Sequence, residues 1–427
     1  MPTTSQWPGS SAGSKTGSRP AGASVGRRTL PWLERLESPV TTYYLLLSAT
    51  AMLVIIGLAM VLSASSVTSY KDTNSSYTIF LNQLQFAVAG VIAALVASRL
   101  SLKIWKRISV PLLMAALVLQ TLVFVPGLGV SVNGNRNWIH IAGQQVQPSE
   151  FAKVALVLFG ATVLTKKRRL LGRFTHVAVP LVFPAGGLLL LLVLGGGDLG
   201  TALVLLAIVG GMLFVAGVPA RMFLVAGAGA AALAATMALT SANRMGRIHT
   251  WLAGCTDPTK CFQTIHGRYA LADGGWWGLG LGASREKWSW LPAAHNDFIF
   301  AIIGEELGLP GTLAIIALFG LLAFACYRLV LRSNDFFVRV ATAGVMVWIL
   351  TQALINIGGV IGLLPVIGVP LPLVSSGGSA LVATLFALGM LVSFARNEPG
   401  CRAALAARPG VVRRSLAVLP TRRGRSS

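Results

Sequence analysis

Long runs of apolar residues make up most of this chain, and short polar or basic segments separate them. A run of about 18–25 apolar residues is long enough to cross a bilayer as a helix. We interpret ten runs as membrane spans, at 41–66, 80–100, 109–128, 150–165, 177–195, 200–218, 222–240, 298–327, 338–362 and 377–395. The sequence therefore predicts an all-α polytopic membrane protein, with a domain of ten transmembrane helices over 41–395.

Composition agrees with this interpretation. The chain is 54% hydrophobic and only 11% charged, whereas an ordinary soluble domain carries about 25% charged residues. Residues 1–40 are rich in Ser, Gly and Pro and lack the apolar core of a signal peptide, which is typical of a disordered tail. Residues 396–427 form a second tail that is rich in arginine.

Positive charge predicts the orientation of the spans. With the N-terminus in the cytoplasm, most of the 35 Lys and Arg residues fall in cytoplasmic tails and loops, as the positive-inside rule requires. Both termini are then cytoplasmic, and the long loop 241–297 between the seventh and eighth spans is extracytoplasmic. The net charge of +22 is thereby explained without nucleic acid, and it favours contact with anionic membrane lipids.

The outer loop 241–297 is rich in tryptophan and in basic residues, among them Arg244 and Arg247. Indole rings favour the membrane interface and cations favour anionic head groups. Two interpretations stay open, a loop that lies on lipid and a platform for a lipid that carries phosphate. Cys255 and Cys261 share this loop, where a disulfide would persist, and two free thiols are the alternative.

Asp297 lies where this loop meets the apolar run that begins at Phe298. A carboxylate at that depth is costly unless it has a partner or a task. It is either the N-cap of a helix or a catalytic residue. Lys153 is the intramembrane cation that we expect beside it, and Glu150 lies on the same helical face three residues earlier. A self-contained pair of Glu150 and Lys153 is the alternative.

Other polar residues in the spans have simpler interpretations. Glu305 and Glu306 lie about 12–13 Å along the helix from Asp297, too far to form a catalytic pair with it. We interpret them as polar packing contacts between helices. Asp198 opens the sixth span, where it either caps the helix or lines a cavity, and we expect His295 to orient its loop.

The segment 364–379 contains Pro365, Pro370 and Pro372, which forbid a continuous helix. Irregular backbone at membrane depth is tolerated where it lines a cavity or is buried in protein. The backbone around Ser375, Ser376 and Gly377 is therefore either an anion-binding nest or a connector without a ligand. No His/Cys cluster has the spacing of metal ligands.

Five motif-like stretches follow one another along the predicted outer face. They are NGNRNWI at 133–139 with QPSEFAK at 147–153, GDLGT at 197–201, DGGWWGLGLG at 273–282, AHNDFIFAIIGEELG at 294–308 and LPVIGVPLPLVSSGGS at 364–379. Together they resemble the shape, elongation, division and sporulation family of peptidoglycan polymerases, over about residues 41–395. The division members are more similar than the elongation members, and the cysteine pair resembles actinobacterial forms.

The resemblance implies a glycosyltransferase that polymerises lipid II outside the cytoplasmic membrane. A sugar hydroxyl attacks the anomeric carbon of a second lipid II, the centre inverts to a β-1,4 bond, and undecaprenyl pyrophosphate leaves. Asp297 matches the family's catalytic aspartate, which accepts the hydroxyl proton, and Lys153 matches a cation of the pocket. Arg136 would meet the pyrophosphate, although relatives place their basic residue where this chain has Asn137.

The resemblance also implies partners. They are a class B penicillin-binding protein and other division proteins at the septum. A divalent cation, Mg or Mn, bridging the aspartate and the pyrophosphate stays open. The competing functions are a flippase of lipid-linked sugars, an elongation polymerase of the same family, and a non-catalytic division scaffold.

Overall fold

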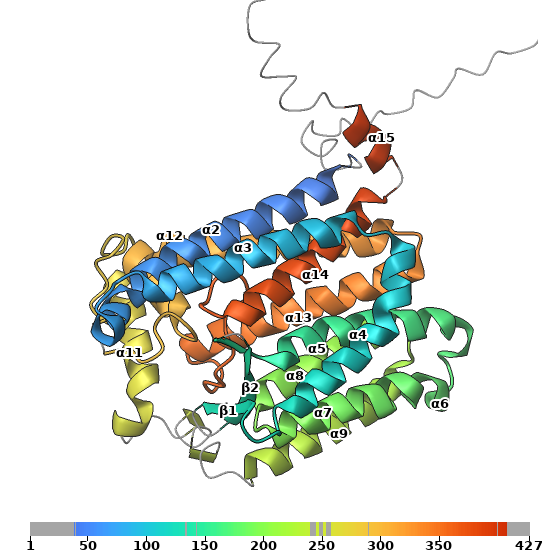
Figure 1. Cartoon of the computed structure of the whole chain (residues 1–427), viewed down its shortest axis with the longest axis horizontal. Coiled ribbons are helices and arrows are strands. Elements are labelled where there is room, and N and C mark those ends of the chain that lie inside the picture. Colours follow the sequence, from blue (N-terminus) through green and yellow to red (C-terminus); the bar gives the residue numbers. More distant parts are fainter. Residues whose placement is uncertain are drawn as a thin grey trace, which may run out of the picture. The chain divides into compact units, whose positions relative to one another are not determined.

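The computed structural model describes residues 38, 40–132, 135–141, 143–239, 245–246, 251–252, 258–288, 290–398 and 400–407 (Figure 1). In this part of the chain, eight helical segments are long and apolar enough to cross a membrane. They are α2 (Thr41–Thr73), α3 (Thr78–Arg99), α5 (Pro148–Lys166), the interrupted segment Thr175–Gly195, α8 (Leu199–Val215), α12 (Ile299–Arg332), α13 (Phe336–Val360) and α14 (Gly378–Arg396). The predicted all-α polytopic class is confirmed.

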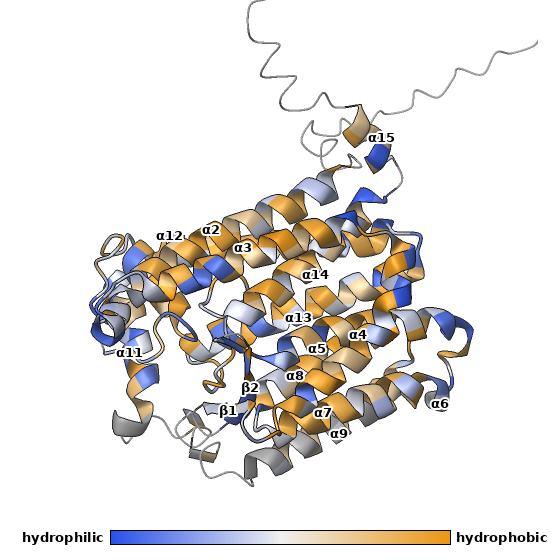
Figure 2. Cartoon of the chain, viewed as in Figure 1, coloured by the Kyte–Doolittle hydropathy of each residue, from blue (hydrophilic) through white to orange (hydrophobic). Residues whose placement is uncertain are grey.

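Two more helices overlap the remaining predicted spans at 109–128 and 222–240. These are α4 (Leu102–Leu122) and α9 (Ala220–Leu239). Short helical turns lie at Arg168–Leu170 and in α15 (Cys401–Ala406). Ten membrane spans therefore remain a prediction that is compatible with the helices described. Figure 2 shows hydrophobic residues along the lengths of these helices and hydrophilic residues toward their ends and around β2.

The helices pack in pairs around two central ones. The pairs are α3 with α14, α2 with α12, α4 with α5, and α8 with α13. In α5 and α14, 78% of the apolar window is buried, against 17% in α3, so α5 and α14 are central and α3 presents most of its surface outward. Gly389 of α14 makes the contact with α3 possible, because a Cβ there would meet the Ala94 carbonyl oxygen at 2.4 Å.

The predicted span 177–195 is not one continuous helix. It consists of α6 (Phe174–Val177), an irregular segment Ala178–Gly186 and α7 (Gly187–Gly195). Val179 and Phe183 have extended backbone angles inside it. Each precedes a proline, and the proline ring disfavours the helical conformation in the residue before it.

Helix α12 is broken at Gly308, which has φ 66° and ψ −162°. Pro310 lacks an N–H, so the Glu306 carbonyl has no donor four residues later. The Gly280 N–H donates to it instead, at 3.0 Å, and Leu279 N–H donates to the Glu305 carbonyl at 2.9 Å. The glycine-rich loop after α11 (Pro258–Gly274) thus completes the helix by hydrogen bonds between backbones.

The segment between α4 and α5 folds into a small antiparallel sheet that the sequence analysis did not predict. Its strands are β1 (Gly129–Val132), β2 (Asn135–Ile141) and β3 (Gln144–Val146), in the order β1-β2-β3. Residues 361–377, between α13 and α14, are not helical, as the prolines require. The sheet and this re-entrant segment stand at one end of the bundle, beside the N-termini of α5, α8, α12 and α14.

Candidate functional site

A cavity of about 440 Å³ lies where these four helix N-termini meet the sheet and the re-entrant segment. Three carboxylates line it, Glu150, Asp198 and Asp297. Neutral polar side chains supply most of the remaining polar lining, namely Asn135, Asn137, Gln147, Gln263, Asn296, Gln352, Thr201, Ser376 and Ser379. Among the residues that the structure describes, the lining contains no Lys, Arg or His.

The backbone around Asp297 is held in place from two sides. The Asn356 side-chain amide donates to the carbonyl oxygens of Asp297 and Val369, both at 2.8 Å. The Ser375 hydroxyl donates to the Asn296 carbonyl at 2.7 Å, and Ser376 N–H donates to the His295 carbonyl at 2.9 Å. The loop before α12 and the re-entrant segment are therefore one hydrogen-bonded unit.

The structure corrects one interpretation of Asp297. The N-cap of α12 is Phe298, one residue later, so the aspartate does not occupy the capping position. Its side chain instead lines the cavity, with one carboxylate oxygen 3.4 Å from where a Cβ on Gly368 would stand. Gly368 has φ 82°, a conformation that glycine adopts without strain.

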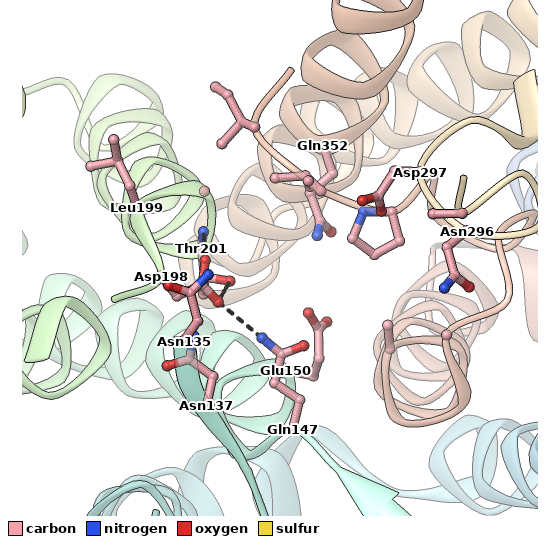
Figure 3. A pocket seen from close by; sticks show the side chains of 18 of the residues that line it. Asn135, Asn137, Gln147, Glu150, Asp198, Leu199, Thr201, Asn296, Asp297 and Gln352 are labelled. Carbon is pink, nitrogen blue, oxygen red and sulfur yellow. Dashed lines mark hydrogen bonds between the residues drawn. The ribbon is translucent and has the colours of Figure 1, made fainter. Parts of the chain in front are cut away.

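Asp198 both caps a helix and lines the cavity. Its carboxylate accepts hydrogen bonds from Thr201 N–H at 2.8 Å and from the Thr201 hydroxyl at 2.7 Å. The Gln147 side-chain amide donates at 2.9 Å to Oδ2, the oxygen that also accepts from the Thr201 hydroxyl, as Figure 3 shows. Both interpretations from the sequence therefore hold for this residue.

Glu150 and Lys153 form a buried ion pair, with 2.8 Å between Nζ and Oε1 and side-chain exposures of 2% and 0%. The lysine ammonium also lies 5.1 Å from the ring centroid of Trp348. Glu150 lines the cavity, whereas Lys153 does not. The second glutamate oxygen, Oε2, is buried and has no hydrogen-bond partner among the described residues. Lys153, which we predicted beside Asp297, therefore lies behind the cavity lining, where it contacts Glu150 and Trp348.

The N-termini of α5, α8, α12 and α14 all point toward this cavity. Each helix N-terminus carries about half a positive charge, because its first N–H groups lack partners within the helix. Such ends stabilise carboxylates and favour a bound anion. They therefore offset some of the negative charge that the three carboxylates bring.

Arg136 lies outside the cavity lining, although its strand neighbours Asn135 and Asn137 belong to it. The guanidinium of Arg136 donates to the Val125 carbonyl at 3.4 Å. The backbone carbonyl of His295 accepts the hydrogen bond from Ser376 N–H, so the expected role of its side chain in orienting the loop stays a prediction. Burial lowers the pKa of the His295 imidazole below the usual 6.5.

The remaining predictions concern the outer loop and the paired glutamates. Arg244, Arg247 and Cys255 lie outside the described residues. Cys261 is disulfide-bonded, and its predicted pairing with Cys255 stays a prediction. Cys326 and Cys401 are buried free thiols.

Glu306 makes a polar packing contact between helices, as predicted for both glutamates, whereas Glu305 contacts the loop that precedes α12. Glu305 accepts from the Ser284 hydroxyl at 2.5 Å and from Arg285 N–H at 2.6 Å. Glu306 accepts from the Ser63 hydroxyl of α2 at 2.6 Å and pairs with Lys287 at 3.3 Å. All of these groups lie away from the cavity.

Sequence reasoning missed Gln352 and Asn356 on α13. Both are almost completely buried, at 3% and 5% exposure. The signal was present, because two amides four residues apart in an apolar span share one helical face. Polar residues inside a span are expensive and mark functional or packing sites.

Comparison with known proteins places these observations in a family. The sequence profile described as "Cell cycle protein", which covers FtsW, RodA and SpoVE, matches residues 44–399. The "Probable peptidoglycan glycosyltransferase FtsW" of Mycobacterium tuberculosis is 42% identical over 400 residues, covering 93% of this chain and 76% of that protein. The "Stage V sporulation protein E" of Bacillus subtilis is 37% identical over 356 residues, covering 82% and 96%.

Solved structures agree. A chain from "Structural coordination of polymerization and crosslinking by a peptidoglycan synthase complex" matches with a TM-score of 0.65 at 29% identity, covering 82% of this chain and 97% of that one. The "Rod shape determining protein RodA" of Thermus thermophilus matches with a TM-score of 0.58 at 26% identity, covering 83% and 96%. This chain belongs to the FtsW, RodA and SpoVE family of multi-pass membrane proteins.

Proposed function

We propose that this chain is a peptidoglycan glycosyltransferase of cell division, which polymerises lipid II into β-1,4 glycan strands. The single observation that carries the proposal is the cavity at the start of α12, where a clamped loop presents the Asp297 carboxylate. Relatives that are 42% identical over most of the chain carry the name of this activity. The division role rests on those names and on the sequence motifs.

In the proposed reaction, Asp297 accepts the proton of the 4-hydroxyl of the acceptor's N-acetylglucosamine. The hydroxyl oxygen then forms a bond to C1 of the donor's N-acetylmuramic acid, on the face opposite the leaving group. The C1–O bond to the pyrophosphate breaks, and undecaprenyl pyrophosphate leaves with the bonding electrons. A positioned carboxylate is useful here because a sugar hydroxyl is a poor nucleophile at neutral pH.

The pyrophosphate needs positive charge that the described cavity lining does not supply from side chains. The helix N-termini of α5, α8 and α14 offer part of it. We propose that Arg136, Arg244 and Arg247 contribute further positive charge to the binding of the pyrophosphate. Among the described residues, no group of three or more His, Cys, Asp and Glu side chains is arranged to hold a metal ion. A divalent cation, Mg or Mn, would therefore need oxygen ligands from the pyrophosphate itself.

Other parts of the proposal concern location and partners. We place the cavity at the extracytoplasmic face of the cytoplasmic membrane, because the positive-inside rule puts both basic tails in the cytoplasm. The partner that we propose is a class B penicillin-binding protein, which would crosslink the strands at the septum. A structural relative comes from a complex that couples polymerisation to crosslinking.

The test is polymerisation of lipid II by the full chain, reconstituted in liposomes with its penicillin-binding partner. Asp297→Asn is expected to lower the rate by about 10²- to 10⁴-fold, the usual contribution of a general base. Asp335→Asn is the matched control. Asp335 caps α13 and pairs with Lys106, and it stands about 30 Å along the helix from Asn356.

Full polymerisation by a folded Asp297→Asn protein would remove the aspartate from catalysis. A folded wild type that makes no glycan but moves lipid II across the bilayer would instead favour the flippase. Loss of activity in both aspartate variants would point to general damage.

A further inference from the structure

One amide on the cavity floor has its hydrogen-bonding direction fixed by the structure. Gln352 lines the cavity and is only 3% exposed. Its side-chain oxygen accepts a hydrogen bond from the indole N–H of Trp348, one helical turn earlier on α13. An indole nitrogen is only a donor, so the amide oxygen must face Trp348. The amide NH₂ group is then the part of Gln352 that is free to face the cavity.

Trp348 is itself fixed. It is fully buried, and the ammonium of Lys153 lies 5.1 Å from its ring centroid, an arrangement that attracts a cation to the ring face. Lys153 is held in turn by Glu150, at 2.8 Å. Three buried side chains therefore determine which way the Gln352 amide points.

The carboxylates of Asp297 and Glu150 line the same cavity as that NH₂ group. Figure 3 shows Gln352 reaching into the cavity beside Asp297 and opposite Glu150. Gln352 makes no other hydrogen bond to a residue that the structure describes. The cavity thus combines a neutral donor with carboxylate acceptors, and its described lining holds no basic side chain.

This pattern selects one kind of ligand. A phosphate oxygen only accepts hydrogen bonds and would be repelled by the carboxylates. A hydroxyl group both donates and accepts, so it can donate to a carboxylate and accept from the amide at once. We infer that Gln352 binds an uncharged hydroxyl oxygen of a sugar ring on the cavity floor, and that the pyrophosphate lies elsewhere in the site.

The identification of the ligand as a sugar rests on the proposed function. The pattern of hydrogen-bond donors and acceptors does not depend on it. Lys153 then acts as a positioning residue, which reaches the ligand through Trp348 and Glu150 without touching it. In this account the lysine's contribution is to hold the amide and the glutamate in place.

The experiment compares two probes at equilibrium, lipid II and undecaprenyl pyrophosphate, which carries the same phosphates and no sugar. Binding is measured on the full chain in nanodiscs, in an Asp297→Asn background that slows turnover. Gln352→Leu is expected to weaken lipid II binding about 5- to 10-fold, the loss of one neutral hydrogen bond. It should leave the binding of undecaprenyl pyrophosphate within about twofold.

A matched control is available in Gln120→Leu. Gln120 is another fully buried glutamine of a membrane helix, and neither atom of its amide has a partner among the described residues. It does not line the cavity, so this substitution should leave the binding of both probes unchanged.

Trp348→Phe supplies a second route, which keeps a ring beneath Lys153 and removes only the N–H donor. It should weaken lipid II binding in the same direction, and it should have no further effect when Gln352 is already leucine. This variant carries the test if Gln352→Leu does not fold.

Two results would overturn the inference. Equal losses for both probes would mean that Gln352 contacts phosphate, and no loss for either would mean that it touches no ligand. Because binding is read without turnover, this outcome is separate from the fate of the proposed function. Undiminished polymerisation by Asp297→Asn would refute the catalytic role of the aspartate. The binding comparison would then be made with undecaprenyl pyrophosphate and a lipid II analogue that cannot be polymerised, so the inference about Gln352 could still be tested.

Discussion

Two groups of acidic side chains lie at the same end of this molecule, and they differ in what their oxygens contact. Glu305 and Glu306, on α12, are enclosed by Ser284, Arg285 N–H, Ser63 and Lys287. The cavity group of Glu150, Asp198 and Asp297 lines an open space, and one oxygen of Glu150 has no partner among the described residues. Both groups come from sequence motifs of the same family.

The difference teaches how to tell a structural carboxylate from a functional one. A buried charge whose hydrogen bonds are satisfied by its own chain stabilises that arrangement and has little capacity left for a ligand. A carboxylate oxygen that accepts no hydrogen bond from the described chain, such as Oε2 of Glu150, keeps that capacity. The enclosed pair should therefore govern stability, and the cavity group should govern activity.

The largest effect on stability is expected for Lys287→Met. The Lys287–Glu306 pair is buried, with side-chain exposures of 4% and 0%, and removing one partner leaves an uncompensated charge that costs about 3–5 kcal/mol. Thermal unfolding in detergent measures the change. Adding Glu306→Gln should restore part of the loss, and no rescue by the double variant would show that the pair is not the cause.

Asn356→Leu should have the next largest effect, and on rate rather than on stability. It removes the two hydrogen bonds that hold Asp297 and Val369, and a displacement of about 1 Å at a catalytic group costs about 10²-fold. The expected result is a lower kcat for polymerisation with lipid II binding largely retained. An unchanged kcat in a folded variant would show that the hydrogen bonds of Asn356 do not position the Asp297 carboxylate.

Asp198 separates capping from charge at one position. Asp198→Ala removes the N-cap of α8 and is expected to cost about 1 kcal/mol of stability. Asp198→Asn keeps a capping oxygen and removes the charge from the cavity, so its unfolding temperature should stay near that of the wild type. Equal destabilisation by both variants would mean that the charge, rather than the cap, matters for folding.

The smallest effect concerns pH. Burial lowers the pKa of His295 in the folded protein, so the unfolded chain binds a proton more readily at this position. Stability from this group is therefore present above pH 6.5 and is lost as the pH falls below that value. His295→Gln should reduce the slope of unfolding temperature against pH between about 7.5 and 5.5. An unchanged slope would assign the acid sensitivity to other groups.

Much of this architecture was predictable because membrane spans are defined by length and hydropathy. The polytopic helical class follows from the apolar runs, and the separation of Glu305 and Glu306 from Asp297 follows from helix geometry. The pairing of Glu150 with Lys153 also follows from local spacing, since residues three apart are neighbours on a helix.

The features that were missed depend on contacts between distant segments. Nothing near Asn356 in sequence indicates that its amide bridges two loops 59 and 13 residues away. The sheet at 129–146 forms against the ends of helices. The alternation of polar and apolar residues in its strands is too weak to predict the sheet from sequence alone. The break in α12 is completed by a loop nearly thirty residues earlier, so Gly308 and Pro310 explain the break but not what fills it.

The central claim is that Asp297 takes part in catalysis, whereas Glu305 and Glu306 stabilise the folded protein. Asp297→Asn and Glu305→Gln test it side by side, with glycan synthesis per folded molecule and unfolding temperature measured on the same preparations. We predict that Asp297→Asn lowers synthesis by about 10²- to 10⁴-fold at a nearly unchanged unfolding temperature, whereas Glu305→Gln lowers the unfolding temperature and leaves synthesis per folded molecule largely intact. The reverse pattern, with a stable but inactive Glu305→Gln protein and an active Asp297→Asn protein, would contradict the account.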